Sequence, residues 1–278
     1  MLPAQTRVAS VTLRARDVGA LGALYEDLLG LAREERPGGG AAYGGLVEAV
    51  PVSPGEPMPP HAHAPGLFHT ALRYPTRAGL AAALRRVTEA GIHLTGASDH
   101  GVSEALYLHD PEGNGVELYW DRPADAWPRT ADGRVDMYTE RLSLESLLRE
   151  DEPAGDGAPD VGHVHLKVSD LPRAVAFWVG VVGFEEQAAY GDQASFVSAG
   201  GYHHHLGLNV WHSRGAAPAP ATSAGLDHLT LAVPSGADVE ALAERLRAAG
   251  APAELGPGGA LRTTDPDGLG LAVLAEPA

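Results

Sequence analysis

The stretch Val161–Asp170, with the sequence VGHVHLKVSD, decides the fold. Polar and apolar residues alternate along it: His163, His165 and Lys167 alternate with Val164, Leu166 and Val168. This period of two is typical of a half-buried strand, with one face on a core and the other carrying two imidazoles and an ammonium group. A helical segment follows the strand and ends at Gly183.

The same pattern occurs 153 positions earlier, in Ala9–Asp17 (ASVTLRARD), where Ser10 stands in the place of His163. A second pair of strand-helix stretches also matches, with His69 placed 159 positions before His228. Each member of this second pair continues into a turn of the form D-P-[DE]-G, which begins at Asp110 or at Asp265. These internal repeats predict four β-helix-β-β-β modules in two tandem halves.

The predicted domains are residues 1–122 and residues 160–278. Between them, residues 123–159 hold four prolines and an acidic stretch, Arg149–Asp156, which is typical of a linker. One short amphipathic helix is expected within it, at Ser143–Glu150. Phe177 and Trp178, on the helix that follows Val161–Asp170, are expected in the core.

Composition excludes several classes of protein. The 278 residues are 44% hydrophobic with a mean hydropathy of −0.10, as expected for a soluble globular protein. No apolar run approaches the roughly 20 residues that span a bilayer, and the N-terminus lacks the apolar segment of a secretory signal. We therefore predict a cytoplasmic protein. A net charge of −16 argues against nucleic acid as a partner. Because cysteine is absent, any metal must bind His, Asp, Glu or water.

Four such modules, with a His in an opening strand and a D-P-[DE]-G turn before the last strand, resemble the vicinal oxygen chelate superfamily. That superfamily includes glyoxalase I, the fosfomycin- and bleomycin-resistance proteins and the extradiol ring-cleaving dioxygenases. Three stretches are most similar to bacterial two-domain catechol 2,3-dioxygenases: Gly162–Asp170, Ser98–Trp120 and Ser198–Trp211. The resemblance implies an α+β fold in which the four βαβββ modules pair into two tandem domains. In each domain the sheet curls into a cup, meaning the concave face that holds the site.

The resemblance also implies a divalent metal, Fe(II) first and Mn(II) or Zn(II) as alternatives, held by two His and one Glu. A small aromatic diol and O₂ would be the substrates. His163 and His228, 65 residues apart, occupy the two opening-strand ligand positions of the second half. The alternative is that each is a buried, hydrogen-bonded structural histidine. We expect the second-half cup to be the catalytic one.

The carboxylate ligand is missing from that half. Seven residues after Asp110 the first half has Glu117, but seven residues after Asp265 the second half has Ala272. A third ligand would then come from the histidines at 203–205 or from water, because Glu276 lies four residues too late. In the first half, His69 and Glu117 match the last two ligand positions of the family. Glu48 is a candidate third ligand in that half. The alternative is that His69 and Glu117 are partnered polar residues inside a vestigial cup.

The run Tyr202–Asn209 (YHHHLGLN) resembles the segment that supplies an acid/base imidazole in ring-cleaving enzymes. Strand alternation would turn His203 and His205 toward the cup, whereas the resemblance favours His204. We therefore take His204 and His205 as the candidate catalytic residues. A surface histidine cluster is the alternative.

The leading hypothesis is an extradiol dioxygenase that cleaves a catechol-like substrate. One alternative is a metal-dependent lyase, isomerase or thiol transferase of the glyoxalase and fosfomycin-resistance kind. Another is a metal-free protein that sequesters a small molecule. The alanine at position 272, where a carboxylate ligand is expected, leaves this alternative open. Exposed cup edges favour a homodimer.

Overall fold

The computed structural model describes residues 1–52, 60–131, 133–151, 153, 155, 157–220 and 222–276. The proline-rich residues 51–65 predict a turn-rich connector, and parts of it and of the acidic stretch at 149–156 lie outside these residues. The first half contains these elements: β1 (Arg7–Ala15), α1 (Val18–Gly22), η1 (Ala23–Leu28), β2 (Arg33–Arg36), η2 (Pro37–Gly39), β3 (Gly40–Tyr43), β4 (Val47–Pro51), β5 (Gly66–Tyr74), α2 (Arg77–Glu89), β6 (Gly96–Asp99), β7 (Ser103–His109) and β8 (Gly115–Asp121).

The linker region contains η3 (Ala124–Ala126), β9 (Glu140–Arg141) and α3 (Leu144–Leu148). The second half contains β10 (Asp160–Lys167), α4 (Leu171–Val175), η4 (Ala176–Val182), β11 (Glu185–Tyr190), β12 (Ala194–Ser198), β13 (Leu206–Asn209), β14 (Gly225–Val233), α5 (Gly236–Ala248), β15 (Glu254–Leu255), η5 (Pro257–Gly259), β16 (Leu261–Thr264) and β17 (Gly270–Ala275). No helix in the described part of the chain is long and apolar enough to cross a membrane.

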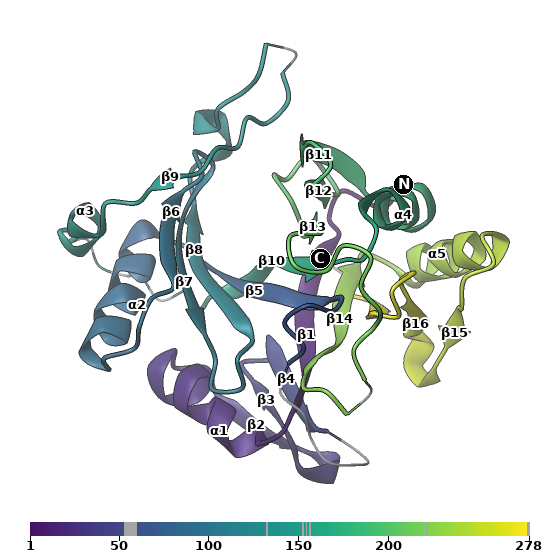
Figure 1. Cartoon of the computed structure of the whole chain (residues 1–278), viewed down its shortest axis with the longest axis horizontal. Helices are drawn as coiled ribbons and strands as arrows, with labels where there is room; N and C mark the ends of the chain where they lie inside the picture. The colour runs from purple at the N-terminus through teal and green to yellow at the C-terminus, as the bar shows by residue number, and fades with distance from the viewer. Residues whose placement is uncertain are drawn as a thin grey trace.

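The strands form two mixed sheets, and the predicted α+β class with four repeated modules in two tandem halves is confirmed. One sheet has the order β15-β16-β17-β14-β1-β4-β3-β2, and the other has the order β11-β12-β13-β10-β5-β8-β7-β6-β9. The opening strands of the modules, β1, β5, β10 and β14, lie at the centre of the molecule, with the longer helices toward its periphery (Figure 1).

The pairing of the modules corrects one expectation. We expected both modules of the second half to share a sheet and its cup. Instead β1 of the first module pairs with β14 of the fourth, and β5 of the second pairs with β10 of the third, both antiparallel. Each opening strand also pairs in parallel with the last strand of its own module, which leaves its other edge free for a partner. Because the four opening strands share one alternating pattern, that pattern does not specify which two of them join.

The first long helix of each half begins at a capping aspartate. Asp17 accepts a hydrogen bond from the Ala20 N–H at 3.1 Å, and Asp170 accepts one from the Arg173 N–H at 2.9 Å. After one α-helical stretch both helices continue as π-helical turns, η1 and η4. The second of these turns ends at Gly183, whose φ of 99° requires a residue without a Cβ atom.

The core lies between the helices and the outer faces of the sheets. Trp178 is fully buried and Phe177 is 6% exposed, as predicted from the sequence. The strand β10 differs from the prediction of half-burial, because both of its faces are buried. On its polar face, His163 and His165 line the cavity described below, and Lys167 Nζ donates to the carbonyls of His61 and Ala62.

The linker packs against the first half. Its strand β9 pairs with β6 at the sheet edge, and α3 is capped by Ser143, which confirms the predicted short helix. The guanidinium of Arg77, at the start of α2, bonds Glu150 at 2.9 Å. The domain boundaries at residues 122 and 160 stay a prediction.

The repeated D-P-[DE]-G turns tie the two modules of each half together, although those modules lie in different sheets. In the first half, Glu112 accepts a hydrogen bond from the Arg16 N–H at 2.9 Å, at the end of β1. In the second half, Asp267 accepts one from the Ser169 N–H at 2.8 Å, just after β10. The third residue of each turn therefore holds the end of the opening strand of the preceding module.

The two turns differ in how they satisfy their leading carboxylate. Asp110 bonds the Asn114 side chain at 2.9 Å, but the residue equivalent to Asn114 in the second turn is Leu269. One oxygen of Asp265 therefore has no partner among the described residues. Burial raises the pKa of the Asp265 carboxyl to about 6, although backbone N–H bonds oppose the shift.

We expect this carboxyl to make the protein less stable as the pH rises. The folded state holds the proton up to about pH 6, whereas an unfolded Asp loses it near pH 4. The stabilisation is thus complete below about pH 4 and is lost as the pH passes through 6, amounting to about 2–3 kcal/mol. Urea unfolding of the wild type and Asp265→Asn at pH 4 and pH 8 measures it. The stability of the wild type relative to the variant should fall by that amount, and a constant difference would contradict the expectation.

Candidate metal centre

Three strands of the nine-stranded sheet bring His69, Glu117 and His163 together. In the strand register, Ala71 of β5 lies opposite Glu117 of β8 on one side and opposite His163 of β10 on the other. Residues in one such row point to the same face of a sheet. The small side chain of Ala71 therefore leaves room for the two flanking side chains to approach across it. His69, two residues before Ala71 on the same face, completes the group.

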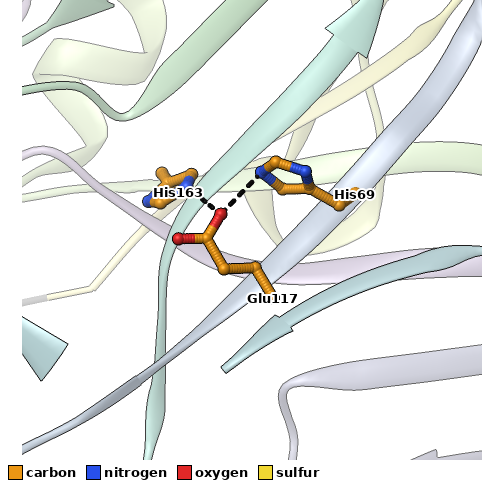
Figure 2. Close-up of side chains that lie close together, drawn as sticks. All are labelled: His69, Glu117 and His163. Carbon is orange, nitrogen blue, oxygen red and sulfur yellow. Dashed lines mark hydrogen bonds and ion pairs between the residues drawn. The ribbon is translucent and has the colours of Figure 1, made fainter. Parts of the chain in front are cut away.

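The three side chains meet at one carboxylate oxygen. Glu117 Oε2 lies 2.9 Å from His69 Nε2 and 3.2 Å from His163 Nε2. Figure 2 shows the two imidazoles on either side of the carboxylate. One donor atom from each residue lies within 4.8 Å of the other two. All three side chains are buried, with exposures of 5% or less.

The charge state of the group suits a cation. Burial alone raises the pKa of the Glu117 carboxyl, but the imidazoles of His163 and His69 outweigh burial and hold that pKa well below its usual range. Burial lowers the pKa of His163, although Glu117 opposes the shift. At neutral pH the group therefore offers a carboxylate together with imidazole nitrogen, which is the donor state that a divalent metal binds.

The geometry fits a metal better than a simple hydrogen-bonded network. His69 Nε2 lies close to the carboxylate, yet it makes no hydrogen bond of acceptable direction to a described residue. A buried nitrogen left in this way is costly unless something else binds it. Two histidines and one carboxylate are the donor set of sites that keep further coordination positions open. His69, Glu117 and His163 therefore form a candidate divalent-metal site.

A cavity of about 710 Å³ opens onto this site. All three donor residues line it, as does His204. The rest of its wall is largely aromatic and apolar, and it includes Phe68, Phe196 and Trp211. Such a volume is in the range of small-molecule sites.

Within the run 203–205, the structure turns His204 toward the site. Its ring centroid lies 4.1 Å from that of His163. His205 does not line the cavity, and its Nδ1 instead accepts a hydrogen bond from the Ala199 N–H at 3.2 Å. The expectation from alternation, that His203 and His205 face the cup, is wrong because β13 begins only at Leu206. The histidines precede the strand, where side chains need not alternate.

A chain of hydrogen bonds fixes the orientation of His204. Asp121 Oδ1 lies 2.8 Å from His203 Nε2, and His203 Nδ1 lies 2.7 Å from His204 Nδ1. A carboxylate only accepts, so His203 donates its Nε2–H to Asp121. When His203 is neutral, its Nδ1 accepts the Nδ1–H of His204. The Nε2 atom of His204 is then the nitrogen that carries no proton and is available to the cavity.

His228 lies in the other sheet, which corrects the expected pair of His163 and His228 on one metal. Its Nδ1 lies 2.8 Å from Asp227 Oδ2, and its Nε2 lies 3.3 Å from the Thr12 hydroxyl. The positions equivalent to the metal site in this sheet are Ser10, His228 and Ala272, so two of the three donors are absent. Within the described ranges, His69, Glu117 and His163 form the one cluster with the spacing of metal donors.

The two other carboxylates considered as ligands have different partners. Glu48 is 38% exposed at its side chain and lies 3.8 Å from the guanidinium of Arg36. Glu276 pairs with Arg7. Neither belongs to the metal site.

Sequence reasoning missed two residues near the site, Tyr107 and His165. Tyr107 lines the cavity, and its hydroxyl lies 2.8 Å from His100 Nε2. Burial and the Glu117 carboxylate raise its pKa well above the usual value. His165 stacks on His69 with centroids 4.7 Å apart, in space that exists because Gly207 has no Cβ atom. A signal for His165 was present, because it shares a strand face with His163. Tyr107 carried none.

The fold and the site together define a protein of paired βαβββ modules with a candidate metal centre on one of its two sheets. Residues 7–118 and 160–273 match the Glyoxalase/Bleomycin resistance protein/Dioxygenase superfamily, and the chain belongs to that superfamily. This confirms the family resemblance seen in the sequence.

Two named relatives are similar to this chain. The catechol-2,3-dioxygenase of Bacillus subtilis (strain 168) is 47% identical over an alignment of 193 residues, and the match covers 66% of this chain and 66% of the relative. The biphenyl-2,3-diol 1,2-dioxygenase 3 of Rhodococcus globerulus is 35% identical over 82 residues, covering 30% of this chain and 37% of the relative. The aligned region therefore spans just under two thirds of the first relative and a smaller part of the second.

Solved structures support the fold. A crystal structure of a Bacillus subtilis protein covers 100% of this chain and 87% of its own at a TM-score of 0.66 and 12% identity. Glyoxalase I from Zea mays covers 98% of this chain and 92% of its own at a TM-score of 0.60 and 14% identity.

Proposed function

We propose that the protein is a divalent-metal-dependent extradiol dioxygenase that cleaves the ring of a catechol-like substrate with O₂. The observation that carries the proposal is the buried group of His69, Glu117 and His163 at the wall of a large apolar cavity, with His204 beside it. The similarity to a catechol-2,3-dioxygenase supports the same reaction. We propose Fe(II) as the metal.

His69, Glu117 and His163 would hold the metal, and Fe(II) supplies the redox chemistry by which a catecholate reacts with O₂. The protein contributes a fixed donor set with a single negative charge, which leaves the metal able to attract an anionic diolate. The aromatic wall presents flat surfaces to a flat substrate, and a substrate bound there would displace water from the cavity. The fixed donor set depends on the nine-stranded sheet, because β5, β8 and β10 of that sheet carry the three donor residues.

His204 would act as the base that prepares the substrate. Burial lowers the pKa of the His204 imidazole well below its usual value, so the ring is neutral before substrate binds. Its unprotonated Nε2 can accept a proton from a catechol hydroxyl, and it can return that proton later in the reaction. His203 and Asp121 keep the acceptor nitrogen turned toward the cavity.

The alternative functions have less support. The hypothesis of a metal-dependent lyase or transferase is supported only by the fold that the chain shares with glyoxalase I. The hypothesis of a metal-free sequestering protein depended on the missing carboxylate at Ala272, but Ala272 is not one of the three donor residues. Cytoplasmic location and homodimerisation stay predictions.

The direct test is oxygen consumption with catechol after anaerobic reconstitution with Fe(II). Absorbance of the yellow ring-cleavage product would be followed in the same assay. We expect turnover that requires both metal and O₂ and that disappears in His163→Ala. Metal retained on His69, Glu117 and His163 with no turnover on any of a panel of catechols would contradict the dioxygenase.

Replacing Asp121 by Asn tests the chain of hydrogen bonds. An amide can present either an acceptor or a donor to His203, so the tautomer of His204 is no longer enforced. We expect kcat to fall about 10- to 100-fold, as for other groups that orient a functional imidazole, with unchanged metal content. The steady-state split between kcat and KM measures this effect.

Asp160→Asn is the matched control for that variant. Asp160 and Asp121 both pair with Arg73, at 2.7 Å and 3.3 Å, but Asp160 bonds no histidine. Its replacement should leave kcat within about twofold of the wild type. An equal loss of kcat in both variants would assign the effect to Arg73 rather than to His203.

A further inference from the structure

Lys167 is the only lysine in the chain, and the proposed reaction does not involve it. Every other one of the 20 basic residues is an arginine. Lys167 is the last residue of β10 and is 9% exposed, so its ammonium group is nearly buried. Lysine presents a compact charge with three hydrogen-bond donors, whereas arginine presents a flat fork of five. A buried lysine in a chain that otherwise uses arginine therefore marks a place to look for a ligand.

Lys167 lines a second cavity, of about 360 Å³. All four opening strands contribute to its wall, through Arg14 of β1, Leu67 of β5, Lys167 of β10 and Leu226 of β14. These strands belong to both sheets, so both sheets bound the cavity. None of the three candidate metal donors lines it. The second cavity is therefore a separate site, although the walls of the two cavities share Phe68, His109 and Gly115.

The internal repeat places two cations in this cavity. Arg14 and Lys167 are equivalent residues of the first and third modules, 153 positions apart. Each lies opposite a glycine in its antiparallel pair of opening strands: Arg14 is opposite Gly225, and Lys167 is opposite Gly66. A Cβ atom added to either glycine would meet no atom within 4 Å. The space beside each cation is therefore open.

The charge of Lys167 has no counter-ion among the residues that the structure describes. Its Nζ donates to the carbonyl oxygens of His61 and Ala62 at 3.2 Å and 3.1 Å, which leaves one of its three N–H groups for a ligand. Burial lowers the pKa of the Lys167 ammonium, and no carboxylate opposes the shift. A buried cation without an anion is costly, and a bound anion would offset that cost.

The other charges in the wall are already paired. The guanidinium of Arg14 lies 3.3 Å from the carboxylate of Asp227. Asp267 is the one carboxylate among the described residues that line the cavity, and it pairs with Arg173. The charge that remains without a partner is therefore the positive charge of Lys167.

Much of the remaining wall is apolar. Leu67, Phe68, Leu226 and Leu269 all line the cavity. An inorganic ion would leave this surface uncovered, whereas the carbon atoms of an organic acid would cover it. The volume of about 360 Å³ is sufficient for such a ligand, because a cavity of roughly 150 Å³ is enough to bind benzene.

We propose that the second cavity binds a small organic carboxylate, with its charged group at Lys167 and Arg14 and its carbon skeleton against Leu67, Phe68 and Leu226. The inference does not depend on the proposed function, because no candidate metal donor takes part in it. Three probes separate the features of such a ligand. Benzoate has both charge and carbon skeleton, benzamide has the shape without the charge, and inorganic phosphate has charge without carbon.

The single lysine makes the site directly observable. Protein grown with carbon-13-labelled lysine gives NMR signals from Lys167 and from no other residue. We expect benzoate to shift these signals to saturation, and benzamide to bind at least about tenfold more weakly because it cannot pair with an ammonium group. Phosphate should also bind at least about tenfold more weakly, because it covers none of the apolar wall. Signals that do not respond to benzoate would overturn the site, and phosphate binding as tight as that of benzoate would overturn the ligand class.

Lys167→Met removes the charge and keeps the length of the side chain. We expect the affinity for benzoate, measured by calorimetry, to fall about 10- to 100-fold, as when a hydrogen bond to a charged group is lost. Arg262→Met is the matched control, because it removes one positive charge from an exposed position of β16 (Leu261–Thr264) outside the cavity. That variant should bind benzoate as the wild type does. An equal loss in both variants would assign the effect to net charge and overturn the site.

The metal centre is the competing place for a carboxylate, and Glu117→Gln tests it. Because Glu117 does not line the second cavity, Lys167 in this variant should respond to benzoate as in the wild type. A response lost in Glu117→Gln would move benzoate to the metal centre and overturn the proposal. A response of Lys167 in a protein that turns over no catechol would refute the dioxygenase and support the carboxylate site.

Discussion

Replacing Glu117 by Gln will remove the bound metal and abolish turnover. Gln keeps the shape of the side chain but takes away the one negative charge of the donor set. Loss of a ligand should cost at least the 10- to 100-fold in metal affinity that is typical when a residue supporting a ligand is lost, so we expect a loss of about 100-fold or more. Elemental analysis after gel filtration measures retained metal. Thermal unfolding with added Mn(II) measures the same affinity without turnover, because a metal that binds only the folded state raises Tm.

His228→Ala is the control for this experiment. His228 holds the position in β14 that His69 holds in β5, but its partners are Asp227 and Thr12. The variant should keep the metal content of the wild type. Metal lost in His228→Ala and kept in Glu117→Gln would place the site in the second half of the chain, on the pair first expected from the sequence.

Replacing His204 by Ala will reduce kcat by about 100- to 10,000-fold, the range typical of a lost general acid or base. Metal content should remain that of the wild type, because His204 is not one of the three donors. Single-turnover measurement of product absorbance, with the metal content determined on the same sample, separates these two effects. A parallel loss of metal would make His204 a ligand instead of a base.

The neighbouring histidine supplies the comparison. His205→Ala also removes a buried imidazole from the same run, but His205 points away from the cavity and bonds the backbone at Ala199. Its kcat, corrected for the fraction of folded protein, should stay within a few fold of the wild type. If His205→Ala abolished turnover while His204→Ala did not, the roles of the two side chains would be reversed.

Much of the fold could be predicted from repeats in the sequence. The strand alternation in Val161–Asp170 and Ala9–Asp17 located the opening strands, and Gly183 located the end of the helix that follows β10. These features depend on local backbone geometry and on burial of one strand face, which neighbours in sequence determine. The resemblance to the superfamily also identified His69, Glu117 and His163 as candidate ligands one by one.

The grouping of those residues was decided only by the tertiary structure. His69 and Glu117 belong to the first half and His163 to the second, and they meet because β5 pairs with β10. Any two of the four opening strands offer similar free edges and similar alternation, so no local signal chooses the partner. The same holds for His204, which faces the cavity because the run of histidines precedes β13 instead of lying within it. The sequence by itself determined the modules and the residue types of the metal site. The long-range pairing of strands determined which of those residues share one cup, since that choice depends on how whole modules pack together.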